Sequence, residues 1–189
     1  GPNAMTIPNI LTFARVALIP LLLVLLFLDG DTMRWWALAL YLTLAVTDYL
    51  DGYLARVLNQ QSELGALIDP IADKILVAAL IVALVGSGDI ARWDIAAAIL
   101  VLSREFLVSG LREFLAQRDL PLLVTKLAKW KTTIQLIAIA LFILPPLDIA
   151  NQALIASSVW WIATLLTLVT GYGYVTSATH RLNHRNADQ

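Results

Sequence analysis

The sequence contains no cysteine, which excludes disulfides, zinc–thiolate sites and thiol catalysis. Its only two histidines, His180 and His184, lie near the C-terminus, which argues against a His-rich metal site or a serine-type triad. Charged residues are also scarce, at 14% of 189 residues, whereas about a quarter of a soluble domain is charged. Hydrophobic residues make up 59%, and the mean hydropathy is +0.77. This composition is typical of a polytopic membrane protein, and the net charge of −1 gives no indication of a nucleic-acid partner.

Apolar stretches separated by short polar, glycine or proline segments predict six transmembrane helices, over residues 9–28, 33–58, 64–85, 93–116, 128–144 and 153–178. The first is long enough, at about 1.5 Å per residue, to cross a hydrocarbon layer of about 30 Å. Short connections make consecutive helices antiparallel. We therefore expect an all-α, six-helix transmembrane bundle that forms a single catalytic domain over residues 5–189. Residues 1–4 resemble a cloning remnant, and no cleavable signal is evident.

Lysine and arginine fall mostly on one side of this predicted bundle, at Arg56, Arg112, Arg118, Lys126, Lys129, Lys131, Arg181 and Arg185. The other side carries only Arg34 and Arg92. Because cytoplasmic loops are rich in basic residues, both termini and the loops after the second and fourth helices are expected in the cytoplasm. The predicted location is a bacterial-type inner (cytoplasmic) membrane.

Four carboxylates lie where apolar helices should carry none: Asp48, Asp51, Asp69 and Asp73. Asp48 and Asp51 are three residues apart and Asp69 and Asp73 are four apart, so the two members of each pair share one helix face. An acid inside a membrane costs about 2–3 kcal/mol, and four close together need counter-charge. Arg56 and Lys74 supply part of it, and oxygen-only ligation favours Mg²⁺ or Mn²⁺ for the rest. The alternative, acids that pair only with Arg and Lys at the membrane interface, fits one aspartate better than four.

Several neighbours of these acids are candidates for substrate contact. Gly52 lacks a Cβ, which lets a ligand approach the backbone. The guanidinium of Arg56 can donate two parallel hydrogen bonds to a phosphate group. The alternatives are helix packing through Gly52 and Gly65 and a positive-inside anchor at Arg56. In the first helix, Asn9, Thr12 and Arg15 lie near one face, where they could contact the nucleotide or the metal shell, or join helices by hydrogen bonds.

The pattern Asp48-x-x-Asp51-Gly52-x-x-Ala55-Arg56, then eight residues and Gly65-x-x-x-Asp69-x-x-x-Asp73, resembles the signature of the CDP-alcohol phosphatidyltransferase family at every defined position. The resemblance implies a six-helix fold that transfers a phosphatidyl group from CDP-diacylglycerol to an alcohol and releases CMP. It implies that the four aspartates hold two divalent ions on the diphosphate and that Asp73 is the general base. It also implies a homodimer. The expected donor-binding residues are Asn9, Thr12, Gly52, Ala55, Arg56, Ser62 and Gly65. Ser62 could equally cap the third helix.

Three further stretches resemble the branch of the family whose acceptor is glycerol 3-phosphate. They are Ile7-Pro8-Asn9-Ile10-Leu11-Thr12-x-x-Arg15, Ser103-Arg104-Glu105-x5-Leu111-Arg112-Glu113-Phe114 and Lys129-Trp130-Lys131-Thr132, where Ala128 replaces a glycine.

A dianionic acceptor such as glycerol 3-phosphate needs a basic pocket. The predicted pocket consists of Arg104, Arg112, Lys129 and Lys131, although the positive-inside rule accounts for some basic residues without a substrate role. Alternative acceptors are phosphatidylglycerol, as in a cardiolipin synthase, inositol phosphate and serine. A divalent-cation transporter is the alternative outside enzymes.

Overall fold

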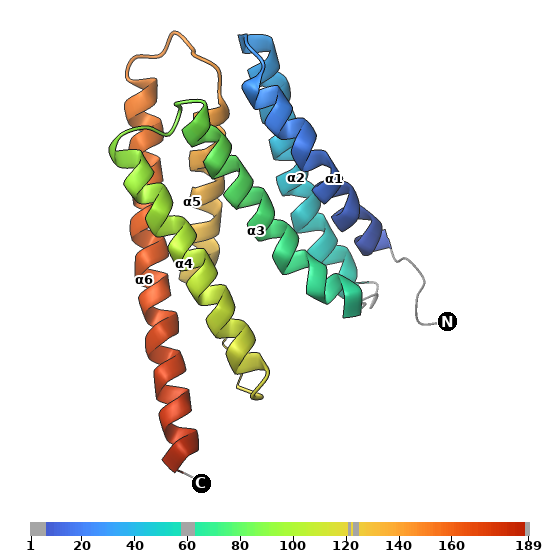
Figure 1. The fold of residues 1–189 in the computed structure, drawn as a ribbon, viewed down its shortest axis with the longest axis vertical. Helices are drawn as coiled ribbons and strands as arrows, with labels where there is room; N and C mark the ends of the chain where they lie inside the picture. The colour runs from blue at the N-terminus through green and yellow to red at the C-terminus, as the bar shows by residue number, and fades with distance from the viewer. Residues whose placement is uncertain (1–6, 58–62, 121, 123–124, 188–189) are drawn as a thin grey trace. The chain divides into compact units, whose positions relative to one another are not determined.

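The computed structural model describes the backbone of residues 7–57, 63–120, 122 and 125–187. It does not describe the side chains of residues 7–9, 51–52, 54–57, 63–67, 69–70 and 184–187 within this range. The described backbone forms six α-helices and no strand: α1 (Ile7–Phe27), α2 (Asp31–Val57), α3 (Glu63–Gly86), α4 (Trp93–Ala116), α5 (Lys126–Ile143) and α6 (Gln152–Ala187) (Figure 1). The all-helical prediction is confirmed.

The helix bounds lie within two residues of the predicted ones, except at the C-terminal end of α6. α5 begins at Lys126 rather than at residue 128, because the Thr125 hydroxyl accepts a hydrogen bond from the Ala128 backbone N–H and caps the first turn (3.2 Å). α6 continues to Ala187, beyond the predicted end at residue 178. Leu182 in this extension packs against the buried cluster between α4 and α6, so the helix still has an apolar surface to cover.

The chain groups into two compact units. The first consists of Gly1–Ile90 and Ile139–Ala150, and the second of Ala91–Ala138 and Asn151–Gln189. The single catalytic domain expected from the sequence stays a prediction.

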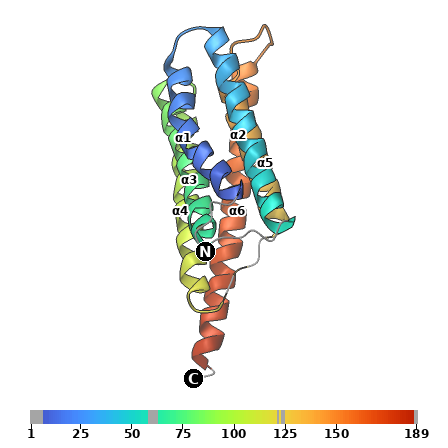
Figure 2. The ribbon, with the colours of Figure 1, turned by 90° about the vertical axis from the view of Figure 1, so that its right-hand side faces the viewer.

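In the first unit, α1 packs against both α2 and α3, and a short turn joins α1 to the antiparallel α2 (Figure 2). The buried face of α1 repeats at alternating steps of three and four residues, through Thr12, Arg15, Ile19, Leu22 and Leu26. This spacing is that of one helix face. At the end of the unit where α1 meets α2, Arg34 forms an ion pair with Asp89 beyond α3 (2.6 Å).

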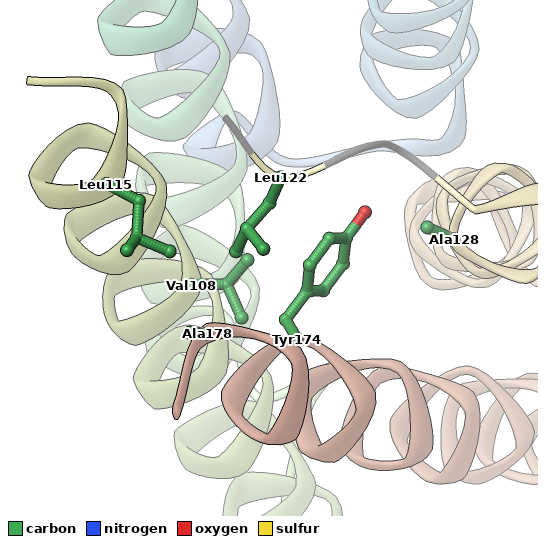
Figure 3. Close-up of a cluster of buried hydrophobic side chains, with 6 residues drawn as sticks. All are labelled: Val108, Leu115, Leu122, Ala128, Tyr174 and Ala178. Carbon is green, nitrogen blue, oxygen red and sulfur yellow. The ribbon is translucent and has the colours of Figure 1, made fainter. Parts of the chain in front are cut away.

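In the second unit, α4 and α6 run side by side, and α6 continues past the end of α4 (Figures 1 and 2). A buried apolar cluster joins them: Val108, Leu115, Leu122, Ala128, Tyr174 and Ala178. The Tyr174 ring extends from α6 toward the segment that carries Leu122 (Figure 3). Near the start of α4, the Asp94 carboxylate accepts hydrogen bonds from Ser157 (2.7 Å) and Trp161 (3.0 Å) of α6. Apolar packing and these polar contacts together hold the α4–α6 pair.

Two of the described helices are long and apolar enough to cross a membrane, α1 over Ile10–Phe27 and α6 over Gln152–Asn183. Only 28% and 33% of these stretches is buried inside the protein, whereas a core helix of a soluble protein is mostly buried. Large apolar side chains are exposed on all six helices, for example Phe13, Val46, Val82, Phe106, Ile137 and Leu165. The predicted spans at α2, α3, α4 and α5 are not confirmed by length and composition, because each of these helices carries several charged residues.

Candidate active site

Two of the four signature aspartates meet at a buried arginine. Asp48 lies near the C-terminal end of α2 and Asp73 in the first half of α3. Their Oδ1 atoms lie 2.7 and 3.1 Å from the same atom, Nη1 of Arg15 on α1. The two carboxylate oxygens are therefore no farther apart than the sum of these distances. One acid from each of the two helices thus lies beside the same guanidinium.

The surroundings of these carboxylates fit a divalent cation. The Arg15 side chain is 1% exposed, whereas those of Asp48 and Asp73 are 44% and 48% exposed, so both acids keep an open side. Oxygen ligands near one another suit Mg²⁺ or Mn²⁺. Among the described side chains, no group of three or more His, Asp or Glu residues forms a metal site. The side chains of Asp51 and Asp69 lie outside those described, so the four-aspartate site stays a prediction.

Most predicted donor-binding residues also lie outside the described part of the structure. Ser62 falls in a segment whose backbone is not described. The structure also does not describe the side chains of the other candidates Asn9, Ala55 and Arg56, or the surroundings of Gly52 and Gly65. Thr12 is described, and its side chain is 1% exposed on the same face of α1 as Arg15. Thr12 thus lies on the same face as Arg15, the residue that pairs with the two carboxylates, as the three-residue spacing predicts.

In the second unit, Arg104 uses its guanidinium to join α4 to α6. Its Nε donates to the Thr167 carbonyl (3.1 Å) and its Nη2 to the Thr170 hydroxyl (2.9 Å). The guanidinium carbon also lies 5.6 Å from the centroid of the Tyr174 ring, within the range of a cation–π contact. Arg104 is 8% exposed, so its hydrogen bonds serve helix packing.

Glu105 connects two of the predicted acceptor residues. Its Oε1 accepts hydrogen bonds from Arg104 Nη1 (3.3 Å) and from the Lys131 ammonium of α5. Lys131 is buried, whereas Arg112 and Lys129 are exposed. The structure therefore brings Arg104 and Lys131 together through a shared carboxylate and leaves Arg112 and Lys129 at the surface of the unit.

A model of the CDP-alcohol phosphatidyltransferase family matches residues 5–170. The chain belongs to this family. The match includes the signature aspartates of α2 and α3 and the basic residues of α4 and α5. Family membership therefore agrees with the resemblance inferred from the signature.

Relatives of known name cover most of this phosphatidyltransferase. A CDP-diacylglycerol–glycerol-3-phosphate 3-phosphatidyltransferase of Rickettsia bellii is 39% identical over 170 residues, which is 89% of this chain and 92% of the relative. One of the same name from Cereibacter sphaeroides is 48% identical over 140 residues, 74% of this chain and 63% of the relative. A CMP-forming cardiolipin synthase of Oryza sativa subsp. japonica is 35% identical over 156 residues, 75% of this chain and 46% of the relative.

Two residues of the phosphatidyltransferase have a part in the site that sequence reasoning did not assign. The sequence allows Arg15 either a ligand contact or a helix–helix contact, and its pairing with both acids joins α1 to α2 and α3. Glu105 belongs to the motif that begins Ser103-Arg104-Glu105. No local feature of the sequence indicates that it pairs with Lys131, since the two residues are 26 positions apart.

Gly171 of α6 is predicted to be required for the seating of Arg104. A Cβ at this position would lie 2.9 Å from Arg104 Cγ, closer than side-chain carbons approach, so Arg104 has to move. We expect Gly171→Ala to lower the free energy of unfolding by about 1–3 kcal/mol through overpacking. The matched control is Gly173→Ala in the same helix, where no atom lies within 4 Å of the added Cβ. Equal unfolding temperatures for the two purified variants would contradict this account.

Glu105 is predicted to stabilise the second unit by neutralising two buried cations. Glu105→Gln removes the negative charge between Arg104 and Lys131, and we expect it to cost about 1.5–3 kcal/mol of stability. Glu113→Gln, at an exposed position of the same helix, should leave the unfolding temperature within error of the wild type. The double variant Glu105→Gln/Lys131→Gln should lose less than the sum of the single variants, because the two side chains are in contact. Strict additivity would show that the pair does not interact.

Proposed function

We propose that this phosphatidyltransferase transfers the phosphatidyl group of CDP-diacylglycerol to sn-glycerol 3-phosphate and produces phosphatidylglycerophosphate and CMP, a step of phospholipid biosynthesis. The observation that carries the proposal is the convergence of Asp48 and Asp73, from two helices, at the signature of the family. The names of the Rickettsia and Cereibacter relatives support the acceptor.

In the proposed reaction, Asp48, Asp51, Asp69 and Asp73 hold two divalent ions. When bound, Mg²⁺ or Mn²⁺ neutralises the donor diphosphate and the charge that develops on the leaving group. The acceptor hydroxyl oxygen forms a bond to the β-phosphorus while the bond from that phosphorus to CMP breaks. Asp73 accepts the hydroxyl proton. The donor is held by Asn9, Thr12, Gly52, Ala55, Arg56, Ser62 and Gly65.

The acceptor phosphate is proposed to bind at Arg104, Arg112, Lys129 and Lys131. The exposed Arg112 and Lys129 are open to a ligand, and Glu105 holds the Lys131 ammonium in place. Arg104 adds positive charge, while its hydrogen bonds to α6 fix the backbone that carries Glu105. Charge-assisted contacts from several basic side chains are what a dianionic phosphate requires.

The membrane topology proposed for this reaction has six spans. Exposed apolar side chains on every helix support it, and so do the short connections and the bias of Lys and Arg. Both termini and the active site then face the cytoplasm across a bacterial-type inner membrane, where lipid donor and water-soluble acceptor can meet. The homodimer implied by the family remains part of this proposal.

A second candidate is transfer to phosphatidylglycerol, favoured by the relative named cardiolipin synthase. That acceptor is a lipid that carries no phosphate monoester, so it has less use for the basic residues of α4 and α5. Inositol phosphate would use a similar pocket. A divalent-cation transporter would bind the same ions without consuming CDP-diacylglycerol.

The metal site predicts that the four aspartates act as one unit. Asp48→Asn, Asp51→Asn, Asp69→Asn and Asp73→Asn should each remove most of the turnover, because each removes a ligand, and double variants should lose less than the product of the single effects. Release of CMP from CDP-diacylglycerol should stop in excess EDTA and return with Mg²⁺ or Mn²⁺. Activity within about threefold of wild type for two of the single variants, or full turnover in EDTA, would refute the metal role.

The proposed acceptor pocket predicts that its variants change the KM for the acceptor and not the KM for the donor. Arg112→Gln and Lys131→Gln should raise the KM for glycerol 3-phosphate about tenfold to a hundredfold, since each loses one charge-assisted contact, and should leave the KM for CDP-diacylglycerol nearly unchanged. Arg118→Gln, near the end of the same α4 region, is the control. The measurement is steady-state kinetics in mixed micelles, with identification of the lipid product from a panel of glycerol 3-phosphate, phosphatidylglycerol, inositol phosphate and serine. A product from phosphatidylglycerol, or loss of donor affinity alone, would overturn the acceptor assignment.

A further inference from the structure

Arg15 is a buried cation on a face of α1 whose other buried side chains are uncharged. The same face carries Ile19, Leu22 and Leu26, and Arg15 is 1% exposed there. A charge removed from water is costly unless it is paired and hydrogen-bonded. A side chain used only to fill space between helices would be apolar, so the guanidinium needs a separate explanation.

The partners of Arg15 supply that explanation. One nitrogen, Nη1, lies 2.7 Å from Asp48 of α2 and 3.1 Å from Asp73 of α3. These carboxylates come from different helices, and like charges at this separation repel each other. α1 contacts both helices, which lets one buried side chain reach both acids while their other sides remain exposed.

We propose that Arg15 is a placeholder cation that holds Asp48 and Asp73 together in the metal-free protein and so keeps the divalent site formed before the ions bind. Arg15 is then a positioning residue, which acts through the two carboxylates. The proposal rests on the proposed function, since it takes these acids to be metal ligands. Arg15 supplies positive charge to both carboxylates without metal, and the ions add to that charge once they are bound.

The placeholder role predicts a stability defect that metal repairs. Arg15→Gln removes the cation that the two carboxylates share, so we expect the unfolding temperature in EDTA to fall by about 5 °C or more. Saturating Mn²⁺ supplies the missing charge and should recover most of that loss. The rise in unfolding temperature on adding Mn²⁺ should therefore be larger in Arg15→Gln than in the wild type. Arg15→Lys keeps the charge without the forked donor and should lie between the two.

The matched control is Arg34→Gln. It breaks an ion pair of similar length, Arg34–Asp89 at 2.6 Å, at the opposite end of the same unit. Its loss of stability should be the same in EDTA and in Mn²⁺. The experiment uses the purified full-length chain in detergent micelles, with Mn²⁺ binding measured in parallel by electron paramagnetic resonance.

Each outcome decides between explanations. Equal losses for Arg15→Gln with and without Mn²⁺ would make Arg15 an ordinary helix–helix contact and overturn the proposal. Unchanged unfolding temperatures under both conditions would point to direct contact with substrate and would also overturn it. If Arg15→Gln folds only with Mn²⁺, the proposal holds, and if it folds under neither condition, the same comparison is made with Arg15→Lys. A wild-type protein that binds no Mn²⁺ would instead remove the metal site of the proposed function.

Discussion

The guanidinium of Arg15 lies between two carboxylates that would otherwise repel each other, and the arrangement of the first unit depends on that pairing. Acids on α2 and α3 can approach only if a cation lies within reach of both. α1 provides it because α1 packs against both helices and because the three- and four-residue repeat through Thr12 and Ile19 turns Arg15 inward. Apolar packing brings the helices together, and the ion pairs determine which polar groups face each other.

In the second unit the buried charged groups also need a counter-charge, but there the shared group is an anion and its two partners are cations. Glu105 is the anion between two buried cations, Arg104 and Lys131. Arg104 is further anchored by the backbone carbonyl of Thr167, and Gly171 leaves the room that its aliphatic portion occupies. Positions that could bind a phosphate thus fall into two kinds. Lys131 is held at a defined place by a carboxylate, whereas Arg112 and Lys129 are exposed.

Local pattern predicted the helices well, because hydropathy and punctuation are properties of short stretches of chain. It failed where a helix end is determined by a contact or a cap. The extension of α6 beyond residue 178 follows from Leu182, whose apolar contact comes from elsewhere in the second unit. The start of α5 follows from the Thr125 hydroxyl. Membrane spans are harder to recognise where charges interrupt the apolar pattern. By length and composition α1 and α6 qualify as spans, whereas α2, α3, α4 and α5 each carry several charged residues.

The sequence by itself determined the six helices, the family and the chemistry expected of it, because the spacing of Asp48, Asp51, Asp69 and Asp73 is read along one stretch of chain and helical periodicity converts that spacing into a shared face. Only the tertiary structure decided which counter-charge each buried group receives. Arg15 and Asp73 are 58 positions apart, and Arg104 and Thr170 are 66 apart. No local spacing encodes such pairs, because their meeting depends on how whole helices pack. The sequence named Arg56 and Lys74 as part of the counter-charge, and the packing of α1 against α2 and α3 adds Arg15 to it.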